Sequence, residues 1–195
     1  MRTLTILATG HSLTPQQVKY VKRSITDVMA INESFLMAPW ADYLYAGDTH
    51  WWSHYGHMVA DKFRGECLTI SKEASLKAPY PEFVEGANRE NSAGGLCMER
   101  GRVYYGGNSG HVAINLAYHM GYERIVLLGF DLHGGHWFKD GFRPDHLDRT
   151  SPYEHFKNTL TDIIDDLEKA GVLVYNCTPN SKLSCLPYTK LEEVL

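Results

Sequence analysis

Short apolar runs alternate along the chain with segments in which apolar residues recur every three or four positions. The runs are typical of buried strands and cover residues 4–8, 27–32, 43–46, 124–129 and 172–176. Helical spacing follows at 51–63, 111–120 and 152–170, and Thr14-Pro15 is typical of a further helix start. Strands that alternate with helices predict a parallel sheet with helices on both faces. We therefore expect a single Rossmann-like α/β domain over residues 1–195.

Two segments interrupt this alternation. Residues 71–101 contain two prolines and four glycines but few periodic apolar residues. Long irregular stretches are uncommon inside a compact domain, so we expect an excursion that faces a substrate or a partner. Residues 133–152 form a polar run for which we expect a lid, and its acidic and imidazole side chains include Asp140, Asp145, His146 and Asp148.

Charge and composition exclude several classes of protein. The formal net charge is −4 and the isoelectric point is about 6.2, so no overall positive field would hold a nucleic acid. The apolar runs fall far short of the roughly 20 residues that span a bilayer, and no signal-peptide cleavage pattern follows the first run. We expect a cytoplasmic protein without a membrane span. The aromatic content of 12% leaves a homo-oligomer open.

The cysteines show no metal-binding pattern. Their positions, without a Cys-x-x-Cys pair or zinc-type spacing, are Cys67, Cys97, Cys177 and Cys185. We therefore expect reduced, buried thiols and no structural metal on sulfur.

Two glycine-containing loops follow expected strands or precede expected helices. The first is Gly10-His11-Ser12-Leu13 and the second is Gly106-Gly107-Asn108-Ser109-Gly110. Glycine lets the backbone approach a ligand closely, and the N–H groups at a helix start favour a phosphate. Ligands of open parallel sheets bind outside the carboxyl ends of the strands. The two loops predict a nucleotide site, with ordinary turns as the alternative.

The segment 129–137, Gly-Phe-Asp-Leu-His-Gly-Gly-His-Trp, follows the strand that the pattern predicts at 124–129. Carboxylate and imidazole groups suit several divalent ions. Asp131, His133 and His136 are therefore candidate metal ligands. The alternative is a polar loop whose histidines are solvated or hydrogen-bonded.

His155 lies in the first turn of the helix expected at 152–170. It precedes Phe156 of the apolar face, so its side chain would point toward the edge of a cleft. Imidazole exchanges protons near neutral pH, which makes this residue a candidate general base. The chain has ten histidines, so position alone does not single out this one.

An aromatic cluster lies near the strand expected at 43–46. Its members are Trp40, Trp51, Trp52 and Tyr55. Such clusters are typical of core or interface packing, and stacking on a base or sugar is the alternative. Asp48 lies beside the cluster at the strand end and is a candidate for binding a ligand hydroxyl.

Several short motifs occur in a consistent order. They are Thr9-Gly10-His11-Ser12-Leu13, Ala30-Ile31-Asn32-Glu33-Ser34-Phe35, Ser109-Gly110, Gly129-Phe130-Asp131-Leu132-His133, His155-Phe156-Lys157-Asn158-Thr159 and Thr178-Pro179-Asn180-Ser181-Lys182-Leu183. This order resembles the bacterial sialyltransferases grouped as glycosyltransferase family 42, together with related small phage proteins of unassigned activity. The family's opening loop is Gly-x-Gly-Pro-Ser-Leu, and His11 stands where it has proline.

The resemblance implies a transferase of the CMP-sialic acid type that requires no metal. It implies that His155 deprotonates the acceptor hydroxyl, while Asp131 is our second catalytic candidate. The donor would be a nucleotide-activated small molecule, and the acceptor is undetermined. The candidate nucleotide-binding residues are Gly10, His11, Ser12, Asn32, Asp48, Asn108, Ser109, Gly110, Gly129, Pro179, Asn180 and Ser181.

Two other hypotheses stay open. The opening loop and the Gly-x-Asp strand end are also similar to those of the archaeal pterin pyrophosphokinase type, which would need Mg²⁺ near Asp48 or Asp131. A non-catalytic nucleotide-binding phage protein that kept the fold is the third hypothesis. A phage-encoded chain would act in the host cytoplasm.

Overall fold

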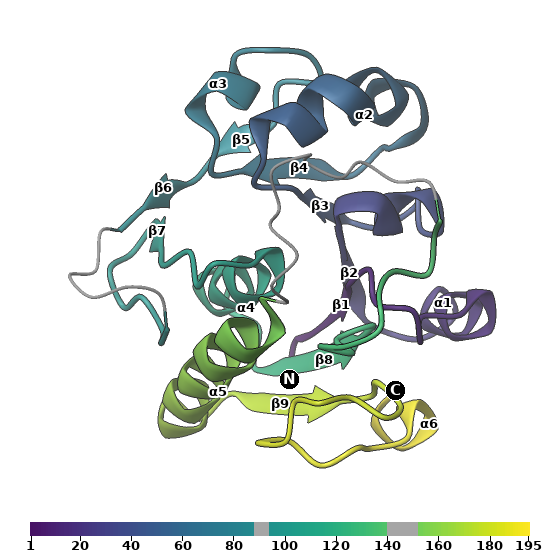
Figure 1. Cartoon of the computed structure of the whole chain (residues 1–195), viewed down its shortest axis with the longest axis vertical. Helices are drawn as coiled ribbons and strands as arrows, with labels where there is room; N and C mark the ends of the chain where they lie inside the picture. The colour runs from purple at the N-terminus through teal and green to yellow at the C-terminus, as the bar shows by residue number, and fades with distance from the viewer. Residues whose placement is uncertain (88–93, 140–151) are drawn as a thin grey trace.

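The protein is built on one parallel sheet. The computed structural model describes residues 1–87, 94–139 and 152–195. The strands of its seven-stranded sheet follow the order β5-β4-β3-β2-β1-β8-β9, and all neighbours are parallel. They are β1 (Thr3–Leu7), β2 (Asp27–Ile31), β3 (Tyr43–Tyr45), β4 (Glu66–Thr69), β5 (Glu82–Phe83), β8 (Arg124–Leu128) and β9 (Leu173–Asn176). The arrangement confirms the predicted α/β class (Figure 1).

Helices cover both faces of this sheet. They are α1 (Pro15–Val21), α2 (Thr49–Lys62), α3 (Lys72–Ser75), α4 (Ser109–His119), α5 (Tyr153–Lys169), α6 (Leu191–Val194) and the 3-10 helix η1 (Asn32–Leu36). Alternate residues along a strand pack into two separate hydrophobic cores, one on each face of the sheet. In β2, Met29 and Ile31 belong to the core that contains residues of α4 and α5, whereas Val28 and Ala30 belong to the core that contains residues of α1 and α2. Because side chains alternate with a period of two and helices cover both sides of the sheet, the central strands β1, β2 and β8 carry apolar residues on both faces.

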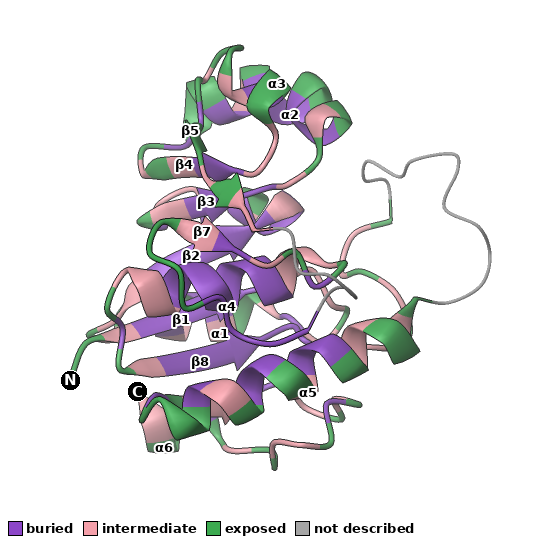
Figure 2. Cartoon of the chain, turned by 90° about the vertical axis from the view of Figure 1, so that its left-hand side faces the viewer, coloured by how far each residue is buried: buried purple, intermediate pink, exposed green. Residues whose placement is uncertain are grey.

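The amphipathic helix expected at 152–170 is confirmed as α5. Its buried face includes Leu160, Ile163 and Leu167 as predicted, whereas Phe156 near the helix start is only partly buried. The opposite face is exposed along the helix (Figure 2). Among the described residues, no helix combines the length and apolar character needed to cross a bilayer.

The segment 71–101 is more regular than its sequence indicates. It contains α3, the edge strand β5, and β6 (Glu85–Gly86), which pairs with β7 (Arg102–Val103) in a separate two-stranded sheet. Strands of two residues show no readable alternation, and β4 was missed because its four residues directly follow a helix end and Gly65. Residues 88–93 of the excursion lie outside the described part. So does most of the expected lid, including Asp140, Asp145, His146 and Asp148.

The topology reverses at β1. From β1 the chain proceeds through β2, β3, β4 and β5 on one side, and then returns to β8 on the other side. Leu7 of β1 pairs with Leu128 of β8, so both strands end at the same level. The pairing continues past the strands, because Gly10 N donates to Gly129 O at 2.9 Å. Ligands of open α/β sheets bind at such a switch point, which places the candidate site at the loops after β1 and β8.

The cysteine environments predict low thiol reactivity at two positions. Burial raises the pKa of Cys67 to about 11, and burial together with Glu192 and Glu193 raises that of Cys177 to about 12. The thiolate is the nucleophile, so we expect iodoacetamide near neutral pH to leave both cysteines unmodified in the folded protein. Peptide mass spectrometry should find both modified only after unfolding. Rapid labelling of either in the native state would contradict this environment.

Candidate functional site

The carboxyl ends of β1 and β8 bring two predicted segments side by side. Beyond the bond between Gly10 and Gly129, Trp137 N donates to Thr9 O at 3.2 Å. Gly10 also forms an isolated antiparallel bridge with His136. The loop after β8 therefore runs along the loop after β1, and their polar side chains share one edge of the sheet.

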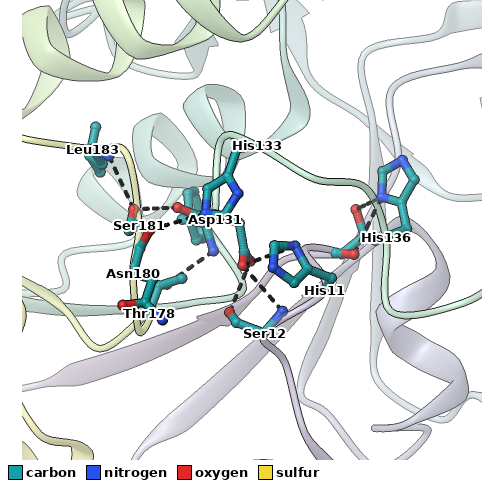
Figure 3. Close-up of polar contacts among 11 residues, drawn as sticks. His11, Ser12, Asp131, His133, His136, Thr178, Asn180, Ser181 and Leu183 are labelled. Carbon is teal, nitrogen blue, oxygen red and sulfur yellow. Dashed lines mark hydrogen bonds and ion pairs between the residues drawn. The ribbon is translucent and has the colours of Figure 1, made fainter.

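Asp131 is the centre of this contact (Figure 3). Its side chain is 1% exposed, and its carboxylate accepts the hydroxyl of Ser12 at 2.9 Å and the backbone N–H of Ser12 at 3.2 Å. His11 Nδ1 lies 3.3 Å from Asp131 Oδ1. A buried carboxylate is costly unless donors surround it, and residues of the β1 loop supply them.

The glycine at position 10 lets the β1 loop lie close to the Asp131 carboxylate. A Cβ at this position would overlap the carboxylate of Asp131 and the carbonyl of Gly129. The glycine thus serves the contact between the two loops. Because Ser12 gives both of its donors to Asp131, a phosphate bound by Ser12 would have to replace these bonds.

The second predicted loop meets the end of β2. Asn32 directly follows β2, and its Nδ2 donates to Ser109 Oγ at 3.4 Å. Asn108 caps α4 by accepting His111 N at 2.8 Å, and its Nδ2 donates to Gly106 O at 3.0 Å. The cap orients the loop, while Ser109 faces the neighbouring strand end.

Three segments that follow strands contain a non-glycine residue in the left-handed backbone region. These are Asn32 after β2, Leu132 after β8 and Asn180 after β9, with φ values of 49°, 56° and 57°. Such conformations are uncommon outside glycine and concentrate at ligand sites. Their location on one sheet edge supports a functional role for that edge.

His155 lies against the same loop as Ser109. It is exposed in the first turn of α5. A Cβ at Gly107 would lie 2.7 Å from His155 Nε2, so the imidazole sits directly over the glycine backbone. Gly110 packs against Phe130 in a similar way, which connects this loop to the segment that contains Asp131.

The segment after β9 lines a cavity of about 360 Å³. Ser181 Oγ donates to Phe130 O at 2.6 Å, which ties the segment to the end of β8. Pro179, Asn180 and Ser181 line this cavity, whereas Ser12, Ser109 and His155 do not. The candidates in the described part of the chain therefore form two neighbouring parts of one edge, and this cavity belongs to the part that follows β9.

Asp48 stands apart from the other candidates. Its carboxylate caps α2 by accepting His50 N at 2.6 Å and Trp51 N at 3.3 Å. Trp51, Trp52 and Tyr55 are buried in the core, which supports the packing interpretation of these aromatic residues. The side-chain N–H of Trp52 donates to Ala46 O at 2.8 Å.

The histidines near Asp131 differ in part from the predicted set. His11, Asp131 and His133 place ligand-type atoms within 4.8 Å of one another. His136 instead lies with its Nδ1 3.0 Å from Thr9 Oγ1. Sequence reasoning chose His136 because it follows the same strand. The same reasoning predicts only a nucleotide-binding role for His11. It misses the contact of His11 with Asp131, which arises because β1 and β8 are parallel neighbours in the sheet.

Comparison with known proteins adds one structural neighbour. No protein-family model matches the chain, and no curated protein matches it. The sialyltransferase CstII from Campylobacter jejuni, solved with the substrate analogue CMP-3FNeuAc, matches with a TM-score of 0.62. The match covers 96% of this chain and 86% of that chain at 15% sequence identity. This protein therefore shares the fold of a sialyltransferase, which it resembles remotely.

Proposed function

We propose that this protein is a glycosyltransferase that uses a CMP-activated sugar, with His155 as general base. One observation carries the proposal: the Asn32–Ser109 contact lies at the same sheet edge as the imidazole over Gly107. The shared fold supports the choice of nucleotide, because CstII was solved with a CMP-sugar analogue.

The start of α4 supplies donors for an anion. The first N–H groups of a helix lack helical partners, and those of Ser109 and Gly110 lie at the first turn. Gly106 and Gly107 have φ values of 54° and 68°, a backbone conformation that glycine adopts without strain. These two glycines let the rings of His111 and His155 approach the loop, and the donors left for a phosphate are the N–H groups at the start of α4, with the Ser109 hydroxyl and the Asn32 amide beside them.

The transfer follows from this arrangement. His155 takes the proton of an acceptor hydroxyl, and the hydroxyl oxygen forms a bond to the anomeric carbon. The bond between that carbon and the phosphate oxygen breaks, and its electron pair leaves with CMP. The donors around Ser109 stabilise the phosphate charge that develops. Attack opposite to the leaving phosphate inverts the anomeric centre.

The geometry favours this reaction over a Mg²⁺-dependent pyrophosphokinase. Neighbouring strands lie about 4.8 Å apart, so the three steps from β3 to β8 separate Asp48 from Asp131 by roughly 14 Å. An ion would therefore bind at one carboxylate or at the other, and the Asp48 carboxylate already accepts His50 N and Trp51 N. The ligand-type side chains grouped with Asp131 are the imidazoles of His11 and His133, whereas Mg²⁺ prefers oxygen ligands.

Substitution of Asn32 by glycine tests the nucleotide site. Glycine tolerates the backbone conformation at φ 49°, so the variant removes the amide without adding strain. We expect CMP affinity, measured by calorimetry, to fall by about two- to tenfold, the worth of one hydrogen bond. The melting temperature without ligand should fall only slightly, because the variant loses the weak hydrogen bond from Asn32 Nδ2 to Ser109 Oγ. Unchanged CMP affinity would remove Asn32 from the site.

Substitution of His155 by alanine tests the base. We expect the release of CMP from CMP-sialic acid in the presence of simple glycoside acceptors to fall by about 10²- to 10⁴-fold. Affinity for CMP should not change. His57→Ala is the matched control, because His57 is an exposed histidine on α2.

The outcomes separate the competing functions. Turnover that survives His155→Ala would refute the base assignment. Nucleotide binding without turnover by the unaltered protein would favour a non-catalytic binding protein. The absence of binding to CMP-, UDP- and GDP-sugars alike would overturn the proposed function.

A further inference from the structure

We propose that His11, Asp131 and His133 bind a divalent transition-metal ion of the Zn²⁺ class. The three side chains come from the loops after β1 and β8, and their ligand atoms lie within 4.8 Å of one another. Two imidazoles and one carboxylate suit zinc and its first-row neighbours, whereas Mg²⁺ and Ca²⁺ prefer oxygen ligands. These three side chains would bind the ion whether or not the protein binds a nucleotide.

The distances agree with direct coordination. His11 Nδ1 and Asp131 Oδ1 are 3.3 Å apart. Two ligands about 2.0–2.1 Å from a tetrahedral zinc ion lie about 3.3 Å from each other. An ion could therefore bind between these two atoms without a change in their separation.

The partner of His133 selects the nitrogen that would bind. His133 Nε2 lies 3.0 Å from the backbone carbonyl oxygen of Asn180. A carbonyl oxygen only accepts, so Nε2 carries the proton and Nδ1 keeps its lone pair. A metal-binding histidine commonly donates its other N–H to a carbonyl in this way.

The surrounding groups hold the ligands in place. Ser12 donates its N–H and hydroxyl to the Asp131 carboxylate, and Lys182 N donates to Asp131 O at 2.9 Å. A Cβ at Gly134 would lie 2.7 Å from the His11 imidazole, so this glycine lets the ring approach the β8 loop. Outer-shell contacts of this kind orient metal ligands. A divalent ion would also compensate the charge of a carboxylate that is 1% exposed.

The site would remain open on one side. Three protein ligands leave a fourth tetrahedral position, which is typical of zinc sites that bind water or substrate. The His11 side chain is 44% exposed, so that position would face solvent at the switch point of the sheet. A bound ion could there receive an anionic oxygen of a ligand.

Metal titration of the full chain tests this site. Protein freed of metal by a chelator is titrated with Zn²⁺ by calorimetry, and Co²⁺ is added to a second sample to record its visible absorption. We expect one ion per chain and a tetrahedral Co²⁺ spectrum. Millimolar Mg²⁺ should not displace the ion.

Single substitutions assign the ligands. His11→Ala and His133→Ala should each weaken Zn²⁺ binding by at least about tenfold and remove the Co²⁺ spectrum. His136→Ala is the matched control, because this histidine lies in the same loop but contacts Thr9, and its affinity should be unchanged. Asp131→Asn keeps the size of the buried side chain while removing its charge, and circular dichroism checks that each variant is folded.

The results that overturn the proposal are direct. If the unaltered protein binds neither Zn²⁺ nor Co²⁺ at one ion per chain, the proposal is wrong and the three residues form only a histidine–aspartate contact. Binding that survives both His11→Ala and His133→Ala in folded variants would place the ion elsewhere. If His136→Ala weakened Zn²⁺ binding as much as His133→Ala does, the proposed set of three ligands would be wrong. All these readouts omit nucleotide, so they stay separate from the tests of transfer.

Discussion

The pairing of β1 with β8 is the contact on which the proposed site depends. The two strands are far apart in sequence, yet Leu7 and Leu128 lie opposite each other in the register. The ladder continues into the loops through Ala8 N to Leu128 O at 2.8 Å and Gly10 N to Gly129 O at 2.9 Å. This continuation sets the positions of the side chains that follow both strands. A shift of one residue in the register would move each of them to the other face of the sheet.

The buried carboxylate of Asp131 turns this backbone contact into a polar site. Charge at a position that is 1% exposed requires compensation, and the β1 loop provides it through Ser12 and His11. This contact requires glycine at position 10, because a Cβ there would overlap the Asp131 carboxylate. The first loop therefore acts as a partner of the β8 loop, and for this reason our proposal places the phosphate at the start of α4 instead.

These contacts divide the candidate residues at the sheet edge into two groups. Asn32, Ser109 and His155 gather around the start of α4, whereas His11, Asp131 and His133 gather at the switch point. Phe130 connects the two groups, since its ring packs against Gly110 and its backbone oxygen accepts from Ser181. In our two proposals the first group binds the phosphate of the donor and the second group binds a metal ion.

The sequence by itself determined the α/β class, most of the long elements and the residues that end each strand. Apolar runs and helical spacing are local signals, and they were sufficient for β1, β2, β8, α4 and α5. Polar residues at strand ends pointed to one edge, because the carboxyl ends of parallel strands lie together. Motif order also indicated the fold shared with a sialyltransferase.

Only the tertiary structure decided which of these residues meet. Strand order is a non-local property, so the sequence did not reveal that Asp48 caps α2 at a distance from Asp131. Nor did it distinguish His11 from His136 as the neighbour of Asp131, because that choice depends on how the β8 loop folds back along β1. The short strands β4, β5, β6 and β7 were hidden for a related reason. Each depends on pairing with a distant segment, and two to four residues hold too little local pattern to predict it.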